Sequence, residues 1–191
     1  GRCVVAGNVR RSAALAMGRH DDVHYLEMKN DSEKLHHHRW GSNNSFNAVV
    51  GMDYTWHAEQ SQKNGEPGYI WLNNARTRGR FKDGERLDDV NVAGFNPCVE
   101  QQLEDAELCC LVETFPAKHE DLEDYLKTLK IAYLYGKTIT LSNTHWPETN
   151  AKMLKNRRIG LSQSGVVQAF NKHGRRELYN WCDNAYEYIQ K

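Results

Sequence analysis

The strongest constraint on the fold is a long helical pattern between two strand-like runs in the second half of the chain. Residues 119–137 place apolar side chains on one helix face, at Leu122, Tyr125, Leu126, Leu129, Ala132 and Tyr133. The run CCLVETF (109–115) precedes this pattern, and RIGLSQSG (158–165) follows a further helical pattern at 148–156. Strands that alternate with helices of this length predict parallel strands in an α/β architecture.

The first half of the chain repeats the alternation with shorter elements. Strand-like runs occur at CVVAG (3–7), FNAVV (46–50) and YIWLN (69–73), with helical patterns at 21–29, 34–40 and 53–63. Residues 74–97 are polar and rich in turn-forming residues, so we expect a long functional excursion there. No internal boundary is evident, and residues 1–191 are predicted to belong to one domain.

The composition limits which partners and which cellular compartment we expect for this chain. The 191 residues include 25 basic and 25 acidic side chains, and this zero formal net charge predicts neither a nucleic-acid nor a membrane partner. We also expect neither a membrane-spanning helix nor a signal peptide. The five cysteines are an odd and sparse set, which indicates a reducing compartment, the cytoplasm, rather than a disulfide framework.

Both ends of the chain have the appearance of cut ends. The chain begins at Gly1 without a methionine, and it stops inside the helical pattern RRELYNWCDNAYEYIQK. We therefore expect a piece of a longer protein.

A cluster of cysteines and polar residues is the best candidate for chemistry. In the stretch NPCVE, Asn96, Cys98 and Glu100 alternate, so in an extended loop an amide, a thiol and a carboxylate would face one site. Cys109 follows at the start of the next expected strand and could approach them. None of the cysteine spacings fits a zinc site.

The alternative for any cysteine is a small, buried apolar side chain without chemistry. This interpretation suits Cys182 and, less clearly, Cys3. The adjacent histidines His36, His37 and His38 would point about 100° apart on a helix, so they could not share one ion. We therefore predict no metal site.

Two polar turns are open to two interpretations each. GNVRRSA (7–13) could bind an anion through its arginines, or it could be a solvated basic turn. GSNNSF (41–46) carries hydroxyl and amide groups that could bind a sugar or a phosphate, although such stretches are more often plain turns.

These motifs, in this order, resemble the ribonucleotide reductases. The stretches are VAGNVRRSA, HHRWGSNNS, NGEPG, NPCVE with a second cysteine eleven residues after the first, and NRRIGLSQSG. They are most similar to the adenosylcobalamin-dependent, class II enzymes of the ribonucleoside-triphosphate reductase type, nearly from end to end. The resemblance implies a central fragment of their ten-stranded α/β barrel, with a finger loop that carries a radical cysteine.

The resemblance implies a role for each residue of the finger. Cys98 matches the thiol that becomes a thiyl radical and abstracts the 3′-hydrogen of the ribose. The resemblance implies that this thiol is buried inside the barrel, because a sulfur radical exposed to solvent would be quenched. Glu100 matches the general base for the 3′-hydroxyl proton, and Asn96 matches the amide that holds the sugar. Cys109 matches one of two thiols that supply two electrons by closing a disulfide, with a partner that lies upstream in the family. Cys110 has no counterpart and is expected to face the opposite side of its strand.

Ligands and partners follow from the same resemblance. The cofactor would be adenosylcobalamin, the substrate a ribonucleotide, and the external reductant thioredoxin or glutaredoxin. Effectors, deoxynucleotides or ATP, would act through Asn8, Val9, Arg10 and Arg11. The substrate would lie near Ser42, Asn43, Asn44 and Ser45.

The sequence departs from the family pattern at the finger. The family commonly has glycine between the radical cysteine and the glutamate, where this chain has Val99. A β-branched residue is expected to exclude a positive φ, which would reshape the finger tip. The family's downstream phosphate-binding loop and terminal cysteines also lack counterparts here, so the isolated chain is expected to be inactive.

Two other functions remain open on the sequence. A thiol-based redox switch would use Cys109 and Cys110 as exposed sensors of low pKa and would bind no nucleotide. An inactive relic would bind nucleotides without reducing them. The sequence does not decide between a di- and a triphosphate substrate, and it does not identify the residues that contact the cobalamin.

Overall fold

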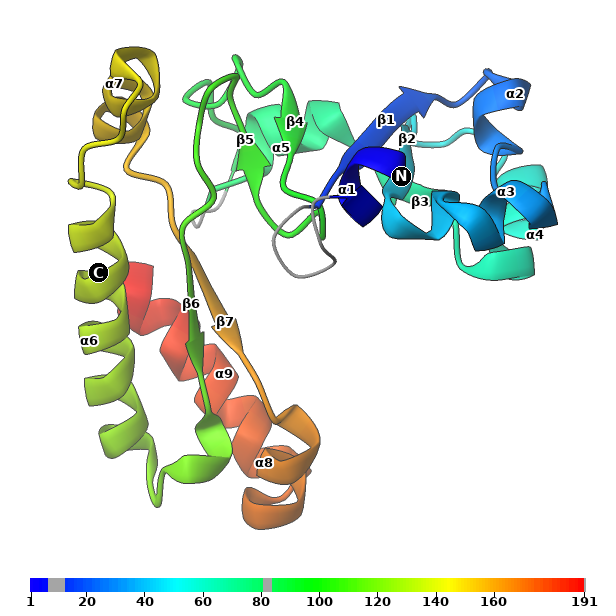
Figure 1. Cartoon of the computed structure of the whole chain (residues 1–191). Coiled ribbons are helices and arrows are strands. Elements are labelled where there is room, and N and C mark those ends of the chain that lie inside the picture. The colour runs from blue at the N-terminus through cyan, green and yellow to red at the C-terminus, as the bar shows by residue number, and fades with distance from the viewer. Residues whose placement is uncertain (7–12, 81–83, 191) are drawn as a thin grey trace. The chain divides into compact units, whose positions relative to one another are not determined.

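The computed structural model describes residues 1–6, 13–80 and 84–190 (Figure 1). The chain forms two compact units, Gly1–Asp105 and Ala106–Lys191, and each is described by itself. That both units belong to one barrel domain stays a prediction. The expected effector residues Asn8, Val9, Arg10 and Arg11 lie outside the described residues.

The first unit is built around a three-stranded parallel sheet with β2 at its centre. Its elements are α1 (Arg2–Ala6), β1 (Leu15–Arg19), α2 (Val23–Leu26), α3 (Ser32–His37), the 3-10 helix η1 (Arg39–Gly41), β2 (Asn43–Asn47), α4 (Thr55–Asn64), β3 (Gly68–Ile70), α5 (Leu72–Arg78), β4 (Gly94–Phe95) and β5 (Gln102–Leu103). In the sheet Leu15 lies opposite Asn43, and Ser45 lies opposite Gly68. The predicted alternation of helices with parallel strands is confirmed.

One face of this sheet carries the core of the unit. Leu26, Phe46 and Ala48 are buried there, and aromatic side chains pack around them. Because strand side chains alternate between the two faces, Phe46 on the core face leaves Asn43 and Ser45 on the other face.

Several local predictions for this unit are wrong. Residues 2–6 form helix α1 in place of the strand expected at 3–7. The strand expected at 46–50 is shifted toward the N-terminus and begins at Asn43, because parallel pairing with β1 overrides the weak strand preference of asparagine and serine. Helix α5 begins at Leu72, where the sequence indicates the end of a strand and then a polar loop.

Charged side chains hold the segment that leads into the β4–β5 hairpin. Arg80 binds the buried carboxylate of Asp89 through two nitrogens, at 2.9 to 3.1 Å. Arg76 Nε donates to the carbonyl oxygen of Val92 at 2.8 Å. These charge-assisted hydrogen bonds order part of the predicted polar excursion.

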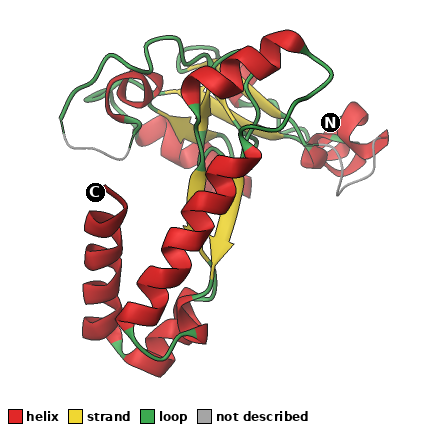
Figure 2. Cartoon of the chain, turned by 90° about the vertical axis from the view of Figure 1, so that its left-hand side faces the viewer, coloured by secondary structure: helices red, strands yellow, loops and turns green. Residues whose placement is uncertain are grey.

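The second unit is a two-stranded parallel sheet with the long helices α6 and α9 beside it (Figure 2). Its elements are β6 (Leu111–Thr114), the 3-10 helix η2 (Pro116–Lys118), α6 (Leu122–Ile139), α7 (Pro147–Asn156), β7 (Gly160–Gln163), α8 (Val166–His173) and α9 (Arg175–Gln190). Leu111 lies opposite Gly160, and the chain between them runs through α6 and α7. The strand–helix–strand crossover predicted for this half is confirmed.

The core of the second unit lies between α6 and α9. Tyr125 and Leu129 of α6 pack with Trp181 and Ala185 of α9, and all four residues are buried. Asp121 caps the start of α6 with its side chain, as aspartate commonly does at this position. The predicted amphipathic helix is therefore confirmed.

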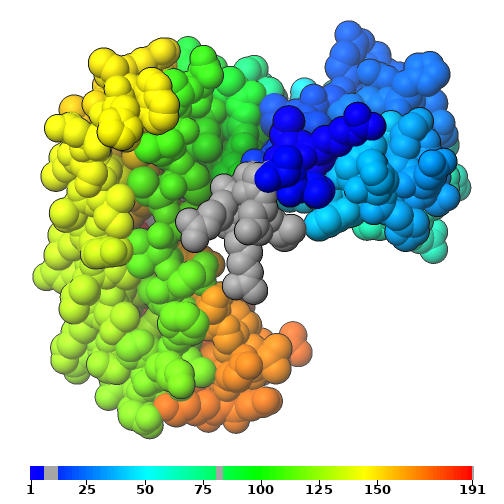
Figure 3. Space-filling view, in the orientation of Figure 1, coloured from blue at the N-terminus to red at the C-terminus, as the bar shows by residue number. Residues whose placement is uncertain are grey.

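The outer face of α6 is apolar as well. In the space-filling view α6 forms a long side of the second unit (Figure 3). Ile131, Leu134 and Tyr135 are exposed there to 68%, 53% and 62%. Across the described ranges, no helix combines the length and the apolarity needed to cross a lipid bilayer.

Candidate active site

The β4–β5 hairpin presents Cys98 at its tip. The N–H of Asn96 donates to the carbonyl oxygen of Gln101 at 3.0 Å. The N–H of Val99 donates to the carbonyl oxygen of Asn96, also at 3.0 Å, which closes a β-turn around Pro97 and Cys98. Proline suits the first central position because its φ is fixed near the required value. Cys98, in the second central position, is exposed.

Asn96 is a structural part of this turn. It is 5% exposed, and its Oδ1 accepts the N–H of Gln101 at 3.0 Å. The segment is therefore a turn and not the expected extended loop, so simple alternation does not place Asn96, Cys98 and Glu100 on one face. Cys98 and Glu100 are both exposed, whereas Asn96 is buried.

The expectation that Val99 excludes a positive φ is wrong. Its φ is +69°, in the left-handed region that costs most residues other than glycine about 1–2 kcal/mol. Hydrogen bonds to Asn96 lie on both sides of this torsion, one from the Val99 N–H and one from the Gln101 N–H. The tip therefore adopts a backbone that would suit glycine, at a cost in strain.

The expected substrate segment lies mostly on β2 rather than in a loop. Asn43 Nδ2 donates to the carbonyl oxygen of Pro97 at 2.6 Å. Asn44 and Ser45 are 2% and 4% exposed, and Ser42 is partly buried. The structure thus joins two predicted motifs that are 54 residues apart in the chain.

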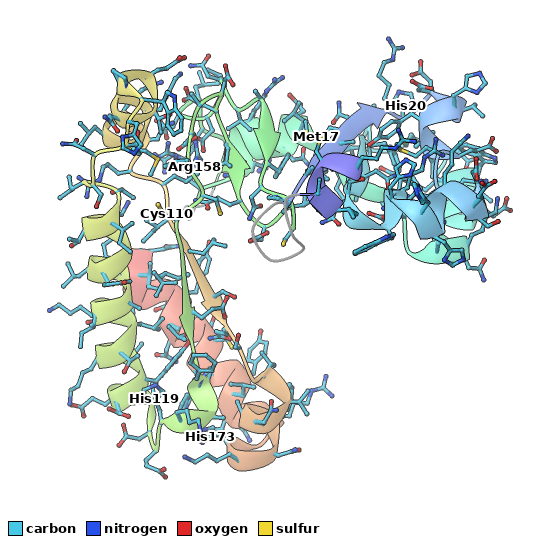
Figure 4. All side chains as sticks on the ribbon, in the orientation of Figure 1. Met17, His20, Cys110, His119, Arg158 and His173 are labelled. Atoms are coloured by element: carbon cyan, nitrogen blue, oxygen red, sulfur yellow. The ribbon has the colours of Figure 1, made fainter. Side chains whose placement is uncertain are left out.

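A second contact joins the base of the hairpin to β1. Met17 lies beside Gly94, since a Cβ placed on Gly94 would be 3.5 Å from the Met17 Cε (Figure 4). The hairpin is therefore supported by the sheet both at its base and at its tip.

A buried ion pair supports the start of β2, and sequence reasoning missed it. Lys29 is 5% exposed, and its Nζ contacts both the Glu66 carboxylate and the carbonyl oxygen of Ser42. The other carboxylate oxygen of Glu66 accepts the N–H of Asn44 at 2.9 Å. The stretch NGEPG indicates a turn by its composition, and nothing in it shows that its glutamate meets a distant lysine.

Tyr25 links β1 to β2 through its hydroxyl group. The hydroxyl oxygen lies 2.5 Å from the carbonyl oxygen of Ala16 and 2.8 Å from that of Ser45. Burial raises the pKa of Tyr25 to about 12, against the opposing effect of its hydrogen bond to Ser45. The phenol is therefore neutral where it joins the two strands.

Cys109 and Cys110 lie in the second unit, just before β6. Cys109 is exposed and Cys110 is half-buried. The N–H of Gly160 donates to the carbonyl oxygen of Cys110 at 2.9 Å, which extends the ladder beyond β6. Burial raises the pKa of the Cys110 thiol, and the charge of Glu107 raises it further. Because Cys98 belongs to the first unit, its meeting with Cys109 in one site stays a prediction.

A buried ion pair lies at the same end of the second unit as Cys110 (Figure 4). Arg158 Nε donates to Glu107 Oε1 at 3.1 Å, and the two side chains are 6% and 0% exposed. Arginine therefore compensates a carboxylate that would otherwise be costly to bury.

Two further predictions concern cysteines and histidines outside these clusters. The buried interpretation of Cys3 and Cys182 is wrong, since both residues are exposed. The Nδ1 atoms of His37 and His38 lie 3.2 Å apart. Among the residues that the structure describes, no three His, Cys, Asp or Glu side chains are grouped so that they could hold a metal ion.

Comparison with known proteins points to one family, although no protein-family model matches the chain. The chain is 48% identical over 193 residues to the adenosylcobalamin-dependent ribonucleoside-triphosphate reductase of Euglena gracilis. It is 43% identical over 173 residues to the enzyme of the same name from Lactobacillus leichmannii. These matches cover 100% and 87% of the chain, but 26% and 23% of the relatives.

A solved structure supports the same assignment. The crystal structure of a B12-dependent, class II ribonucleotide reductase matches 85% of the chain with a TM-score of 0.72 and 38% sequence identity, over 23% of its own length. The chain thus spans about a quarter of the length of the curated relatives it matches. By sequence and by fold, these 191 residues are similar to one segment of the adenosylcobalamin-dependent, class II ribonucleotide reductases.

Proposed function

We propose that this chain is the segment of a class II ribonucleotide reductase that carries the radical cysteine. The observation that carries the proposal is the hydrogen-bonded hairpin turn with Cys98 at its tip and Glu100 two residues later. The reaction would be reduction of a ribonucleotide, a ribonucleoside triphosphate, to the 2′-deoxyribonucleotide. The two parallel sheets would be parts of the ten-stranded α/β barrel around this hairpin.

Cys98 acts in the proposal as a thiyl radical. Its sulfur takes the 3′-hydrogen atom of the ribose, which restores the S–H bond and leaves a carbon radical at C3′. Glu100 accepts the proton of the 3′-hydroxyl group as general base. Asn96 keeps its expected contact to the sugar, and its Oδ1 also fixes the turn through Gln101.

Cys109 supplies half of the dithiol that reduces the 2′-carbon. Loss of the 2′-hydroxyl group as water and its replacement by hydrogen consume two electrons and two protons. Two thiols release both when one S–S bond forms between them. The exposure of Cys109 suits later exchange with thioredoxin or glutaredoxin. Cys110 is a poor partner for it, since adjacent cysteines rarely form a disulfide without strain.

Adenosylcobalamin, when bound, would supply the radical that starts the reaction. What this cofactor requires of the chain is a thiol that a radical can reach, and Cys98 at the tip of the hairpin turn is the thiol that we propose for it. We assign no residue of the chain to holding the corrin ring.

Two motifs supply the nucleotide contacts in the proposal. The substrate would lie against the segment that bonds to the finger tip, formed by Ser42, Asn43, Asn44 and Ser45. The effector, a deoxynucleotide or ATP, would be relayed by Asn8, Val9, Arg10 and Arg11. We place the reaction in the cytoplasm, where thioredoxin and glutathione systems keep thiols reduced.

The redox-switch alternative is less well supported. It requires two adjacent thiols of low pKa, whereas burial and the charge of Glu107 raise the pKa of Cys110. The inactive-relic alternative differs from the proposal in activity alone, so an activity measurement separates the two.

The test is a Cys98→Ser variant of the complete gene product, assayed for reduction of all four ribonucleoside triphosphates with adenosylcobalamin and a dithiol. We expect loss of reduction with unchanged nucleotide affinity. Cys182→Ser is the matched control, because Cys182 is also exposed but belongs to α9 of the second unit and to none of the predicted motifs. Reduction by the Cys98→Ser variant would overturn the proposal, and inactivity of the wild type with intact nucleotide binding would favour the relic.

A further inference from the structure

We propose that Asn43 positions the reactive thiol, by holding the peptide group that joins Pro97 to Cys98. The side-chain amide nitrogen of Asn43, Nδ2, donates to the Pro97 carbonyl oxygen at 2.6 Å. This inference rests on the proposed function for the identity of Cys98 as the reacting group. It gives Asn43 a different task from the substrate contact expected of its motif.

The accepting carbonyl is well placed to orient Cys98. A peptide group is planar, so fixing the oxygen of Pro97 also fixes the plane that contains the Cys98 nitrogen and Cα. The ring of Pro97 already limits the preceding φ, and the Val99-to-Asn96 hydrogen bond closes the turn on the far side of Cys98. The Asn43 bond supplies the missing link from this local turn to the sheet.

The backbone around Asn43 is held on every side, which makes it a rigid anchor. Its own N–H donates to the carbonyl oxygen of Ala14 at 2.9 Å. The carbonyl oxygen before it, on Ser42, accepts from the buried Lys29, and the N–H after it, on Asn44, donates to Glu66. The buried Lys29–Glu66 pair therefore clamps the two peptide groups that flank Asn43.

The contact requires a donor, which makes the choice of asparagine testable. An asparagine amide carries two N–H donors, whereas an ionised aspartate of the same shape only accepts. Asn47 offers a matched comparison, since it lies on the same strand and the same sheet face as Asn43. Its Oδ1 accepts the N–H of Leu72 at 3.1 Å, a bond that aspartate would keep.

The experiment compares Asn43→Asp, Asn43→Leu and Asn47→Asp in the complete gene product. We expect both Asn43 variants to lose kcat by roughly ten- to a hundredfold with KM and nucleotide affinity unchanged, since misplacing a reacting group affects the chemical step. Asn47→Asp should retain both constants. The second readout is the rate at which iodoacetamide alkylates Cys98 in the cofactor-free protein, resolved by mass spectrometry, with Cys182 as internal reference. Both Asn43 variants should change the Cys98 rate by more than about threefold, the equivalent of one hydrogen bond.

Each contrary outcome overturns the inference in a distinct way. A raised KM with unchanged kcat would make Asn43 a substrate contact, and an equal loss in Asn47→Asp would assign the effect to the strand as a whole. Unchanged Cys98 alkylation in both Asn43 variants would show that the bond does not hold the tip. The alkylation readout stands even if Cys98→Ser retains activity, so failure of the proposed function is distinguishable from failure of this inference.

Discussion

Replacing Val99 by glycine should stabilise the hairpin, against the usual effect of glycine. Val99 has a φ of +69°, which costs about 1–2 kcal/mol for a residue with a Cβ. Glycine removes this cost. It also destabilises the fold by about 0.5–1 kcal/mol, because glycine loses more backbone entropy on folding. A Val99→Ala variant loses the same methyl groups yet keeps the Cβ, so comparison with it removes most of the packing change. We therefore expect the hairpin to be more stable in Val99→Gly than in Val99→Ala, by about 0.5–1 kcal/mol.

Hydrogen exchange of the Gln101 amide provides the assay. This amide donates to Asn96 Oδ1 inside the turn, so its exchange reports local opening of the hairpin. The expected difference corresponds to exchange that is about two- to fivefold slower in Val99→Gly than in Val99→Ala.

Val90 provides the matched control, because it lies in a turn of the same unit without a positive φ. There glycine should be the less stable of the two variants, by about 0.5–1 kcal/mol, measured at the nearby Val92 amide. The reasoning would be refuted if glycine were also the less stable variant at position 99.

Three further predictions concern buried or half-buried groups. Arg158→Met should lower the free energy of unfolding by about 3–5 kcal/mol, measured by urea titration, because it removes the arginine that pairs with the buried Glu107 carboxylate. Adding Glu107→Leu should recover most of the loss, and a double variant as unstable as Arg158→Met alone would contradict this explanation. Tyr25 has a pKa raised from 10.0 to about 12, so the stability that its neutral phenol contributes is present below pH 10 and is lost as the pH rises through 12. Wild type should therefore lose more stability than Tyr25→Phe over that interval in alkaline unfolding followed by circular dichroism, and parallel curves would contradict the assignment. Iodoacetamide should alkylate Cys110 more slowly than Cys109 at neutral pH, because burial raises the Cys110 pKa and lowers its thiolate fraction; peptide mass spectrometry measures both rates, and a faster Cys110 would count against this account.

Elements with a local signal could be predicted, and contacts between distant residues could not. Helix α6 was foreseeable because its buried residues, such as Tyr125 and Leu129, repeat at helical spacing within one segment. The start of β2 at Asn43 was not, because asparagine and serine read as a turn until β1 and β3 supply backbone partners. The same limit applies to Lys29 and Glu66, whose pairing depends on tertiary packing alone.

The finger shows where local steric rules mislead. The NPCVE motif was enough to single out Cys98, but the expected burial of this thiol is not found, since Cys98 is exposed at the tip of the turn, and its role stays a prediction. The alternation rule failed there because proline and the Val99-to-Asn96 hydrogen bond close a turn within five residues. Hydrogen bonds from Val99 and Gln101 to Asn96 lie on either side of Val99, whose φ its side chain disfavours, so closing the turn outweighs a single steric preference.

The parallel pairing of β6 with β7 has a consequence for the order of folding. Leu111 and Gly160 can pair only when the whole α6–α7 connection between them closes into a loop. This closure costs conformational entropy, and the cost is larger while the connection is still unstructured. Helix α6, whose backbone hydrogen bonds join residues close in the chain, is then the element expected to form first and to shorten the connection that the strands must close. Shortening a side chain of α6, as in Leu129→Ala, should slow refolding. Shortening a side chain of β6, as in Val112→Ala, should mainly speed unfolding. Stopped-flow chevron plots of the two variants would reveal the opposite order if the strands met before the helix formed.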